Sequence, residues 1–159
     1  MKALAKRISS AGFTLVELMV TVAIVAILVS LAVPSFREMS AAQRVRSATY
    51  SIISDLTLAR SEAVKRGADV TLTPLVANNW TSGWRVSVAS SSELLSEQSD
   101  VGKGVVFATA PARVTFNRYG RINSVAVVRF QLTDVSARSR CVSLNPSGRP
   151  KNVNKECPL

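Results

Sequence analysis

Residues 12–34 read GFTLVELMVTVAIVAILVSLAVP, and this stretch decides how the rest of the chain is organised. The 21 residues from 13 to 33 contain a single charged side chain, Glu17. As a helix with a rise of about 1.5 Å per residue, they extend about 31 Å, enough to cross the hydrocarbon core of a bilayer. Residues 1–12 carry three basic side chains and no acid. We therefore predict a leader followed by a membrane helix; the alternative is a secretory signal peptide removed after Ala32.

Glu17 is the informative residue of this segment. A carboxylate inside an apolar helix costs about 2.5 to 3.5 kcal/mol on insertion scales unless a partner relieves it. If the chain were cut between Gly12 and Phe13, the new ammonium would lie one helical turn from the carboxylate. The alternative is that Glu17 lies near the interface, where it is protonated or hydrated.

The order of basic leader, GFTLVEL, apolar run and Pro34 resembles the type III signal sequence of type IV pilins and type II secretion pseudopilins. The resemblance implies that a prepilin peptidase cuts between Gly12 and Phe13 and methylates the new amine. It also implies that Glu17 pairs with the terminal amine of a neighbouring subunit during filament assembly. Two charges that are costly alone in lipid neutralise each other when subunits dock in register.

The two cysteines, Cys141 and Cys157, favour an exported domain. They enclose 15 residues, and a disulfide closing such a loop contributes about 3 kcal/mol in the chain-entropy model. Disulfides persist in the periplasm or outside the cell, whereas the alternative is a pair of reduced buried thiols. The basic leader favours the cytoplasmic side, although Arg37, Arg44 and Arg46 after the segment make this bias weak. Together with the resemblance, these features imply a single-pass protein of the bacterial inner membrane whose C-terminal head is periplasmic and which enters a pilus or pseudopilus.

The helix is predicted to continue beyond the membrane, up to a stop at Gly67. Apolar and small residues recur there at steps of three and four, which indicates one stripe of an amphipathic helix. They are Val45, Ala48, Ile52, Leu56, Ala59 and Ala63. Glu62 and Arg66 form an i,i+4 pair, and Pro34 predicts a kink or a local melt.

After Gly67 the pattern changes to short segments of high β propensity. We expect strands at 70–76, 84–88, 105–109, 114–117, 125–132 and 140–144, and a surface loop at 90–99. Turns are predicted at Asn78-Asn79, Ser82-Gly83, Tyr119-Gly120 and Pro146-Ser147-Gly148. Trp80 and Trp84 are expected to pack on the helix stripe; stacking on a ligand is the alternative.

The predicted fold is therefore α+β: a long N-terminal helix packed on a small antiparallel β-rich head, the lollipop shape of a pilin. Its segments are a cleaved leader (1–12), a transmembrane and assembly helix (13–33), the amphipathic continuation of the helix (34–67) and the head (68–159). LARSEAVKRG at 58–67, GWRV at 83–86 and the late YGR and SGR elements resemble the H-type pseudopilin (GspH) and the FimT and FimU minor pilins. This resemblance implies a low-abundance subunit that primes or caps a filament, with other pilins or pseudopilins as partners.

Positive charge gathers in the last third of the chain. Residues 13–100 hold 7 basic and 8 acidic side chains, whereas residues 101–159 hold 10 and 2, a net charge of +8. The sequence GRPK at 148–151 resembles the GRxR motif of FimT-type DNA-uptake pilins, with lysine in place of the last arginine. The candidate DNA-binding residues are Arg138, Arg140, Arg149, Lys151 and Lys155. The alternative is that these cations keep the head soluble or pair with acidic neighbours in the filament.

Composition excludes several other classes. The chain has 159 residues, 47% of them hydrophobic and 19% charged, which suits one ordered domain rather than a disordered protein. It contains no histidine, which excludes His-based acid–base chemistry and His-ligated metal sites. We predict no catalytic residues, metal or cofactor. A plain bitopic membrane protein, an H-type pseudopilin and a DNA-binding pilin are the alternatives to a minor pilin.

Overall fold

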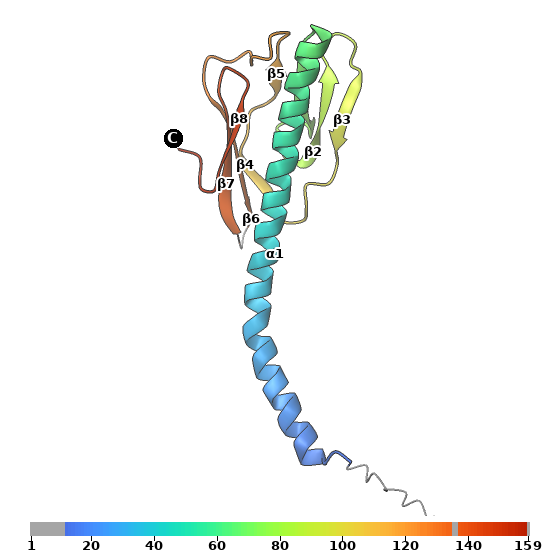
Figure 1. Ribbon diagram of the computed structural model, residues 1–159, viewed down its shortest axis with the longest axis vertical. Helices are drawn as coiled ribbons and strands as arrows, with labels where there is room; N and C mark the ends of the chain where they lie inside the picture. The colour runs from blue at the N-terminus through green and yellow to red at the C-terminus, as the bar shows by residue number, and fades with distance from the viewer. Residues whose placement is uncertain (1–11, 135–136, 159) are drawn as a thin grey trace, which may run out of the picture. The chain divides into compact units, whose positions relative to one another are not determined.

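The computed structural model describes residues 12–134 and 137–158. In this part of the chain one long helix precedes eight strands, which form two antiparallel sheets. The α+β class predicted from the sequence is therefore confirmed (Figure 1). The chain divides into two units, Met1–Phe36 and Arg37–Leu159, and the second is called the globular unit below.

Helix α1 covers Leu15–Arg66, within two residues of its predicted start and at its predicted end. The helix ends because Gly67 adopts a φ of +63°, which a residue without a side chain adopts freely. The amide of Ala68 then donates to the carbonyl of Ala63, as in a Schellman cap. Residues on both sides of Pro34 are helical, so the predicted local melt does not occur, and the kink stays a prediction.

The first sheet follows the helix directly. It consists of β1 (Val70–Val76), β2 (Asn79–Val88), β3 (Leu94–Gln98) and β5 (Val114–Phe116), in the order β3-β2-β1-β5. The second sheet consists of β4 (Val106–Thr109), β6 (Val128–Asp134), β7 (Ala137–Leu144) and β8 (Pro150–Val153), in the order β4-β6-β7-β8. All six strand pairs within the described ranges are antiparallel.

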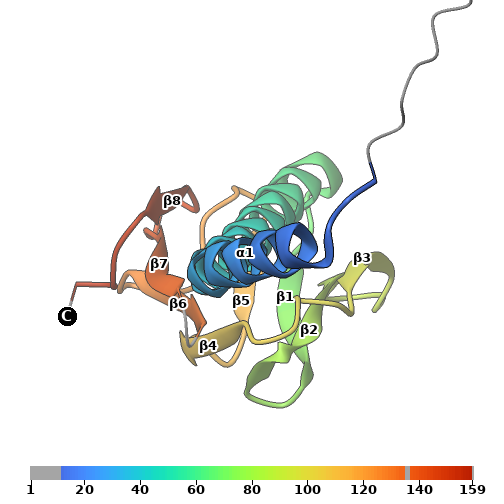
Figure 2. The same cartoon turned by 90° about the horizontal axis from the view of Figure 1, so that it is seen from below.

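Within the globular unit, α1 lies on one side of both sheets (Figure 2). Burial is restricted to one stripe of the helix, since its remaining faces have no sheet to contact. All six residues predicted for that stripe are less than 5% exposed, which confirms the periodicity: Val45, Ala48, Ile52, Leu56, Ala59 and Ala63.

Aromatic side chains fill the space where the two sheets meet. Trp80 and Trp84 of β2 are 2% and 0% exposed, so their predicted packing in the core is confirmed. The Trp80 ring meets the Phe130 ring edge to face, with centroids 5.0 Å apart, and Trp84 meets Phe107 in the same way at 5.9 Å. Such pairs add to the free energy gained by burial alone.

Two predictions about the first sheet are wrong. Residues 94–98, inside the predicted surface loop, form the edge strand β3. Ser82-Gly83 is not a turn, because β2 runs through it and the hairpin turns at residues 77–78 instead. Gly83 serves a different purpose: a Cβ atom there would lie 2.1 Å from the carbonyl oxygen of Gln98. A glycine thus permits the close approach of β3 to β2.

The second sheet also departs from the prediction. Strand β6 begins at Val128 rather than at 125, and the side chain of Val125 is fully exposed. Strand β8, which starts with Pro150, was not predicted, because proline is depleted in strands. Pro150 is tolerated because β8 is the last strand of its sheet.

Candidate functional site

The first candidate site is the start of α1. The amide of Glu17 donates to the side-chain oxygen of Thr14 at 3.2 Å, which makes Thr14 the N-cap of the helix. The sequence Thr14-Leu15-Val16-Glu17 also has the spacing of a capping box, in which a threonine precedes a glutamate by three residues. The capping role of Thr14 was not predicted, because Glu17 was considered only for the free-energy cost of its carboxylate in lipid. In the first turn the charge of Glu17 is additionally favoured by the helix dipole.

The apolar part of α1 has no protein cover. Every large apolar side chain between Phe13 and Val33 is at least 40% exposed. Among the described residues, α1 is the one helix long and apolar enough to cross a membrane. An exposed apolar surface of this length marks contact with lipid or with other subunits. Gly12 has open space around its Cα, and Phe13 is 74% exposed, so the Gly12–Phe13 bond is sterically accessible.

A disulfide joins Cys141 on β7 to Cys157 in the segment after β8. The Cys141 side chain is fully buried, and the Sγ of Cys157 lies 3.6 Å from the carbonyl oxygen of Phe130 on β6. The bond therefore holds the C-terminal segment against the second sheet.

The predicted DNA-binding residues do not form one group. Arg149 lies in the turn before β8, beside the pair Leu144–Pro150 at one end of the β7–β8 ladder. Arg140 lies next to the pair Cys141–Val153 at the other end, and its guanidinium donates to the Asn154 side chain at 2.6 Å. The two ends are about 10 Å apart at 3.4 Å per residue.

The other three candidates are Lys151, Lys155 and Arg138. Lys151 of β8 is exposed and pairs with Ser143 of β7. Lys155 is exposed and lies beyond the end of β8. The side chain of Arg138 lies outside the described residues. Arg149, Lys151 and Lys155 form no ion pair with any described residue.

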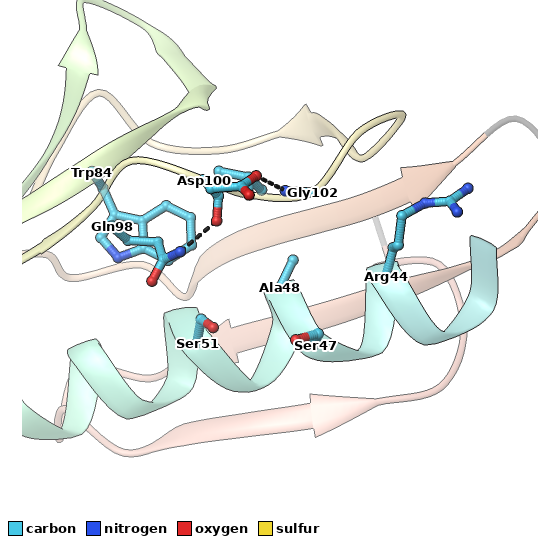
Figure 3. A pocket seen from close by; sticks show the side chains of 9 residues that line it. Arg44, Ser47, Ala48, Ser51, Trp84, Gln98, Asp100 and Gly102 are labelled. Carbon is cyan, nitrogen blue, oxygen red and sulfur yellow. Dashed lines mark hydrogen bonds between the residues drawn. The ribbon is translucent and has the colours of Figure 1, made fainter. Parts of the chain in front are cut away.

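A hollow of about 200 Å³ lies between α1 and the loop that follows β3 (Figure 3). Its lining consists of Arg44, Ser47, Ala48, Ser51, Trp84, Gln98, Asp100, Val101 and Gly102. The side chain of Gln98 donates to the Asp100 carbonyl, and the Gly102 amide donates to the Asp100 carboxylate at 2.8 Å. These groups maintain the loop conformation, and neither Ser47 nor Ser51 of the lining is hydrogen-bonded to the Asp100 carboxylate.

Arg44, at the edge of this hollow, connects the helix to the second sheet. Its guanidinium lies 3.2 Å from the carboxylate of Asp134, which is only 7% exposed. Gly104 packs against the same carboxylate, because a Cβ there would lie 2.8 Å from the oxygen. The ion pair is thus a structural contact between α1 and β6.

Comparison with known proteins identifies two regions of the chain. Residues 7–33 match the prokaryotic N-terminal methylation motif, and residues 48–148 match the family described as type II transport protein GspH. No curated protein sequence matches the chain.

Two crystal structures of the type IV minor pilin FimU of Pseudomonas aeruginosa share the fold. The first is 20% identical, with a TM-score of 0.60, and the match covers 69% of this chain and 87% of that one. The second is 22% identical, with a TM-score of 0.58, and covers 68% and 91%.

Proposed function

The chain belongs to the GspH family, and from that premise we propose that it is a minor type IV pilin, processed by prepilin peptidase and incorporated into a pilus or pseudopilus. The observation that carries the proposal is the order of the two matched regions. A methylation motif on an uncovered apolar helix precedes a GspH region that covers the globular fold from Ala48 of α1 through strand β7. We assign the subunit to the priming or tip complex of the filament, with the other pilins as its neighbours.

Glu17 supplies the mechanism. Its carboxylate is the single charge between residues 13 and 33, and cleavage after Gly12 creates the matching ammonium at Phe13. The two groups neutralise each other when one subunit docks on the next, which relieves the cost of a lone charge in lipid. A subunit in the wrong register leaves both charges unpaired, so the pair also selects the docking position.

The N-terminus of the mature protein tests the processing step. Sequencing is expected to begin at Phe13, and mass spectrometry to show one added methyl group on its amine. A plain bitopic membrane protein would keep residues 1–12, and a secretory protein cut after Ala32 would begin at Val33. Either result would overturn the proposal.

Glu17→Gln tests the assembly step. Glutamine satisfies a capping box as glutamate does, so the helix start is retained while the charge is lost. We expect the variant to be cleaved normally and to be absent from sheared filaments. Glu38→Gln, which removes an exposed acid from the same helix outside the apolar segment, is the matched control and should assemble. Normal incorporation of the Glu17→Gln variant would show that the charge plays no part.

An H-type pseudopilin of type II secretion is the alternative within the family, and the family description favours it. The two roles differ in what fails when the protein is removed. Loss of a pseudopilin stops the export of folded proteins and leaves surface pili intact, whereas loss of a minor pilin reduces the pili.

DNA binding through the basic C-terminal region is the second candidate function. It is favoured by the exposure of Arg149 and Lys151, which have no acidic partner among the described residues. Four phosphate contacts predict that log K falls with log salt at a slope of about −3.6 on duplex DNA. Absence of binding at low salt, or binding that Arg149→Ala with Lys151→Ala leaves unchanged, would reject this candidate.

A further inference from the structure

Two turns of the globular unit have the same sequence pattern and share two hydrogen bonds. Residues 117–121 read NRYGR and residues 145–149 read NPSGR, so both follow the pattern Asn-x-x-Gly-Arg. The glycine amide donates to the asparagine carbonyl at 2.8 Å in the first and 2.9 Å in the second. The arginine amide donates to the asparagine side chain at 3.1 and 3.3 Å. We call these segments the paired turns.

The paired turns contact each other. A Cβ atom on Gly148 would lie 2.2 Å from the carbonyl oxygen of Gly120, so the second turn sits directly against the first. The amide of Ile122 donates to the carbonyl of Pro146 at 3.3 Å and continues this contact. Both glycines are buried and have positive φ angles of 69° and 73°, which a larger residue would strain. Arg121 and Arg149, the residues that follow them, are exposed.

Helix α1 also contacts the first turn. The Nε of Arg60 donates to the Gly120 carbonyl oxygen at 3.0 Å. A hollow of about 420 Å³ lined by Thr57, Arg60, Ser61, Val64 and Lys65 adjoins this contact, since Val64 lies 3.0 Å from a Cβ built on Gly120. The first turn is thus held both by the second turn and by helix α1.

Tyr119 projects from the first turn with 75% of its surface exposed, although a tyrosine ring gains free energy from burial. Its neighbours Arg118 and Arg121 are exposed as well. No described carboxylate pairs with Arg118, Arg121 or Arg149, and Glu62, on the nearby helix, is already engaged by Arg66. An aromatic ring among unpaired guanidinium groups matches the chemistry of bases and phosphates.

We propose that the paired turns bind single-stranded DNA, with Arg121 and Arg149 on consecutive phosphates and Tyr119 stacked on a base. This inference rests on the DNA-binding candidate function and relocates it from the β7 and β8 cations to the turns. Single strands are favoured because a duplex keeps its base faces stacked and closed to Tyr119. The fixed backbone of both turns lowers the ordering cost of binding.

The test uses the full chain in non-ionic detergent and a fluorescent oligo-dT of about 16 nucleotides, with a duplex of equal length beside it. Fluorescence anisotropy is expected to show tighter binding of the single strand. Tyr119→Ala should weaken that binding by about 5- to 150-fold and leave duplex binding unchanged, whereas Tyr119→Phe should retain it.

The arginines are tested through the salt dependence. Arg121→Ala and Arg149→Ala should each reduce the log–log slope by about 0.7 on single strands. Arg113→Ala, which removes another exposed charge outside the paired turns, is the matched control and should leave the slope unchanged. Arg149→Lys should bind more weakly than wild type, because it keeps the charge and loses the two-pronged contact. Thermal unfolding of each variant checks that the fold is intact.

The outcomes separate this inference from the candidate function beneath it. If DNA binds and neither turn arginine nor Tyr119 affects it, the inference is wrong and the β7 and β8 cations remain candidates. Equal affinity for duplex and single strand also overturns it. No binding at low salt, or binding only to vesicles of anionic lipid, overturns the inference and the DNA candidate together. Assembly through Glu17 is unaffected by any of these results.

Discussion

Asp55 is a polar residue of α1 that contacts two strands of the first sheet. Its carboxylate accepts a hydrogen bond from the indole nitrogen of Trp84 at 2.7 Å and another from the Ser96 hydroxyl at 2.9 Å. Trp84 is fully buried, so its N–H depends on Asp55 as its hydrogen-bond acceptor. A buried tryptophan on β2 and an edge strand are thus both held by one acid of α1.

Asp55→Ala is expected to destabilise the globular unit by about 3 kcal/mol. The substitution removes a charged acceptor and leaves the Trp84 N–H buried without a partner. Urea unfolding of the full chain in micelles, followed by tryptophan fluorescence, measures the change.

Asp55→Asn keeps one side-chain oxygen and should cost less than the alanine variant. Asp69→Ala removes an exposed acid from the helix–strand connection and should stay within about 0.5 kcal/mol of wild type. Equal stability of the Asp55 and Asp69 alanine variants would mean that water replaces the carboxylate.

Sequence patterns at this scale predict apolar burial better than polar partners. The spacing of small and aliphatic residues placed the six stripe residues in the core, and the usual burial of aromatic rings placed the two tryptophans there, because burial depends mainly on residue type and period. In the sequence, Asp55 is one more charged residue beside the stripe. Its role depends on an indole 29 residues later in the chain, and no local pattern contains that information.

At the scale of elements, the last turn of α1 carries a network of charges. Arg66 lies 2.6 Å from Glu62 and 2.8 Å from Glu93, and thereby joins the helix to the loop before β3. The hydrogen bond from Arg66 lowers the pKa of Glu62 below its ordinary value of 4.5, and the nearby Lys65 acts in the same direction. The same hydrogen bond raises the pKa of Arg66.

The lowered pKa of Glu62 predicts a dependence of stability on pH. Because the folded chain binds this proton less tightly than the unfolded chain, the contribution is complete above about pH 4.5 and is lost as the pH falls through the lowered folded value. Glu62→Gln should therefore lower the melting temperature at pH 7 and converge with wild type in acid. Melting curves between pH 7 and pH 3 provide the measurement.

Glu156→Gln is the control for this titration, because Glu156 is exposed and has no ion pair with a described residue. Its melting temperature should follow that of wild type across the whole range. A Glu62→Gln difference that is constant with pH would trace the effect to packing rather than to charge.

The ends of helices and strands were predicted correctly where a nearby residue determines them. Gly67 ends the helix by adopting a positive φ, and β1 begins and ends as predicted. Strand β3 was missed because LLSEQ lacks β-branched residues and forms a strand through its pairing with β2. The shift of β6 has a similar cause: its register is set by pairing with β7, which leaves Val125 outside the sheet.

At the scale of the whole molecule, the charge distribution shows what topology adds to composition. The excess of +8 after residue 100 is visible in the sequence, yet its arrangement is not. Arg140 and Arg149 are nine residues apart and lie at opposite ends of one ladder, while Gly120 and Gly148 are 28 residues apart and touch. The position of the paired turns therefore depends on the arrangement of the two sheets, which the sequence does not specify locally.

The disulfide stabilises the whole globular unit by restricting the unfolded chain. Cys141 and Cys157 are separated by 16 positions, and closing a loop of that length contributes about 3 kcal/mol in the chain-entropy model. Cys157→Ser should accordingly lower the melting temperature by about 10 °C, given the usual enthalpy of a domain of this size. Cys157 is the better position to change, since Cys141 is fully buried and a hydroxyl there would need its own partner.

Reductant supplies the internal control for that measurement. Dithiothreitol should lower the melting temperature of wild type to that of Cys157→Ser and leave the variant unchanged, because both treatments remove the same cross-link. Wild-type chains purified from an oxidising compartment should show no free thiol before reduction. A reductant effect of equal size on the variant, or free thiols in the purified protein, would show that the bond does not form in the cell. The globular unit would then depend on its core alone, and export to an oxidising compartment would lose its chemical support.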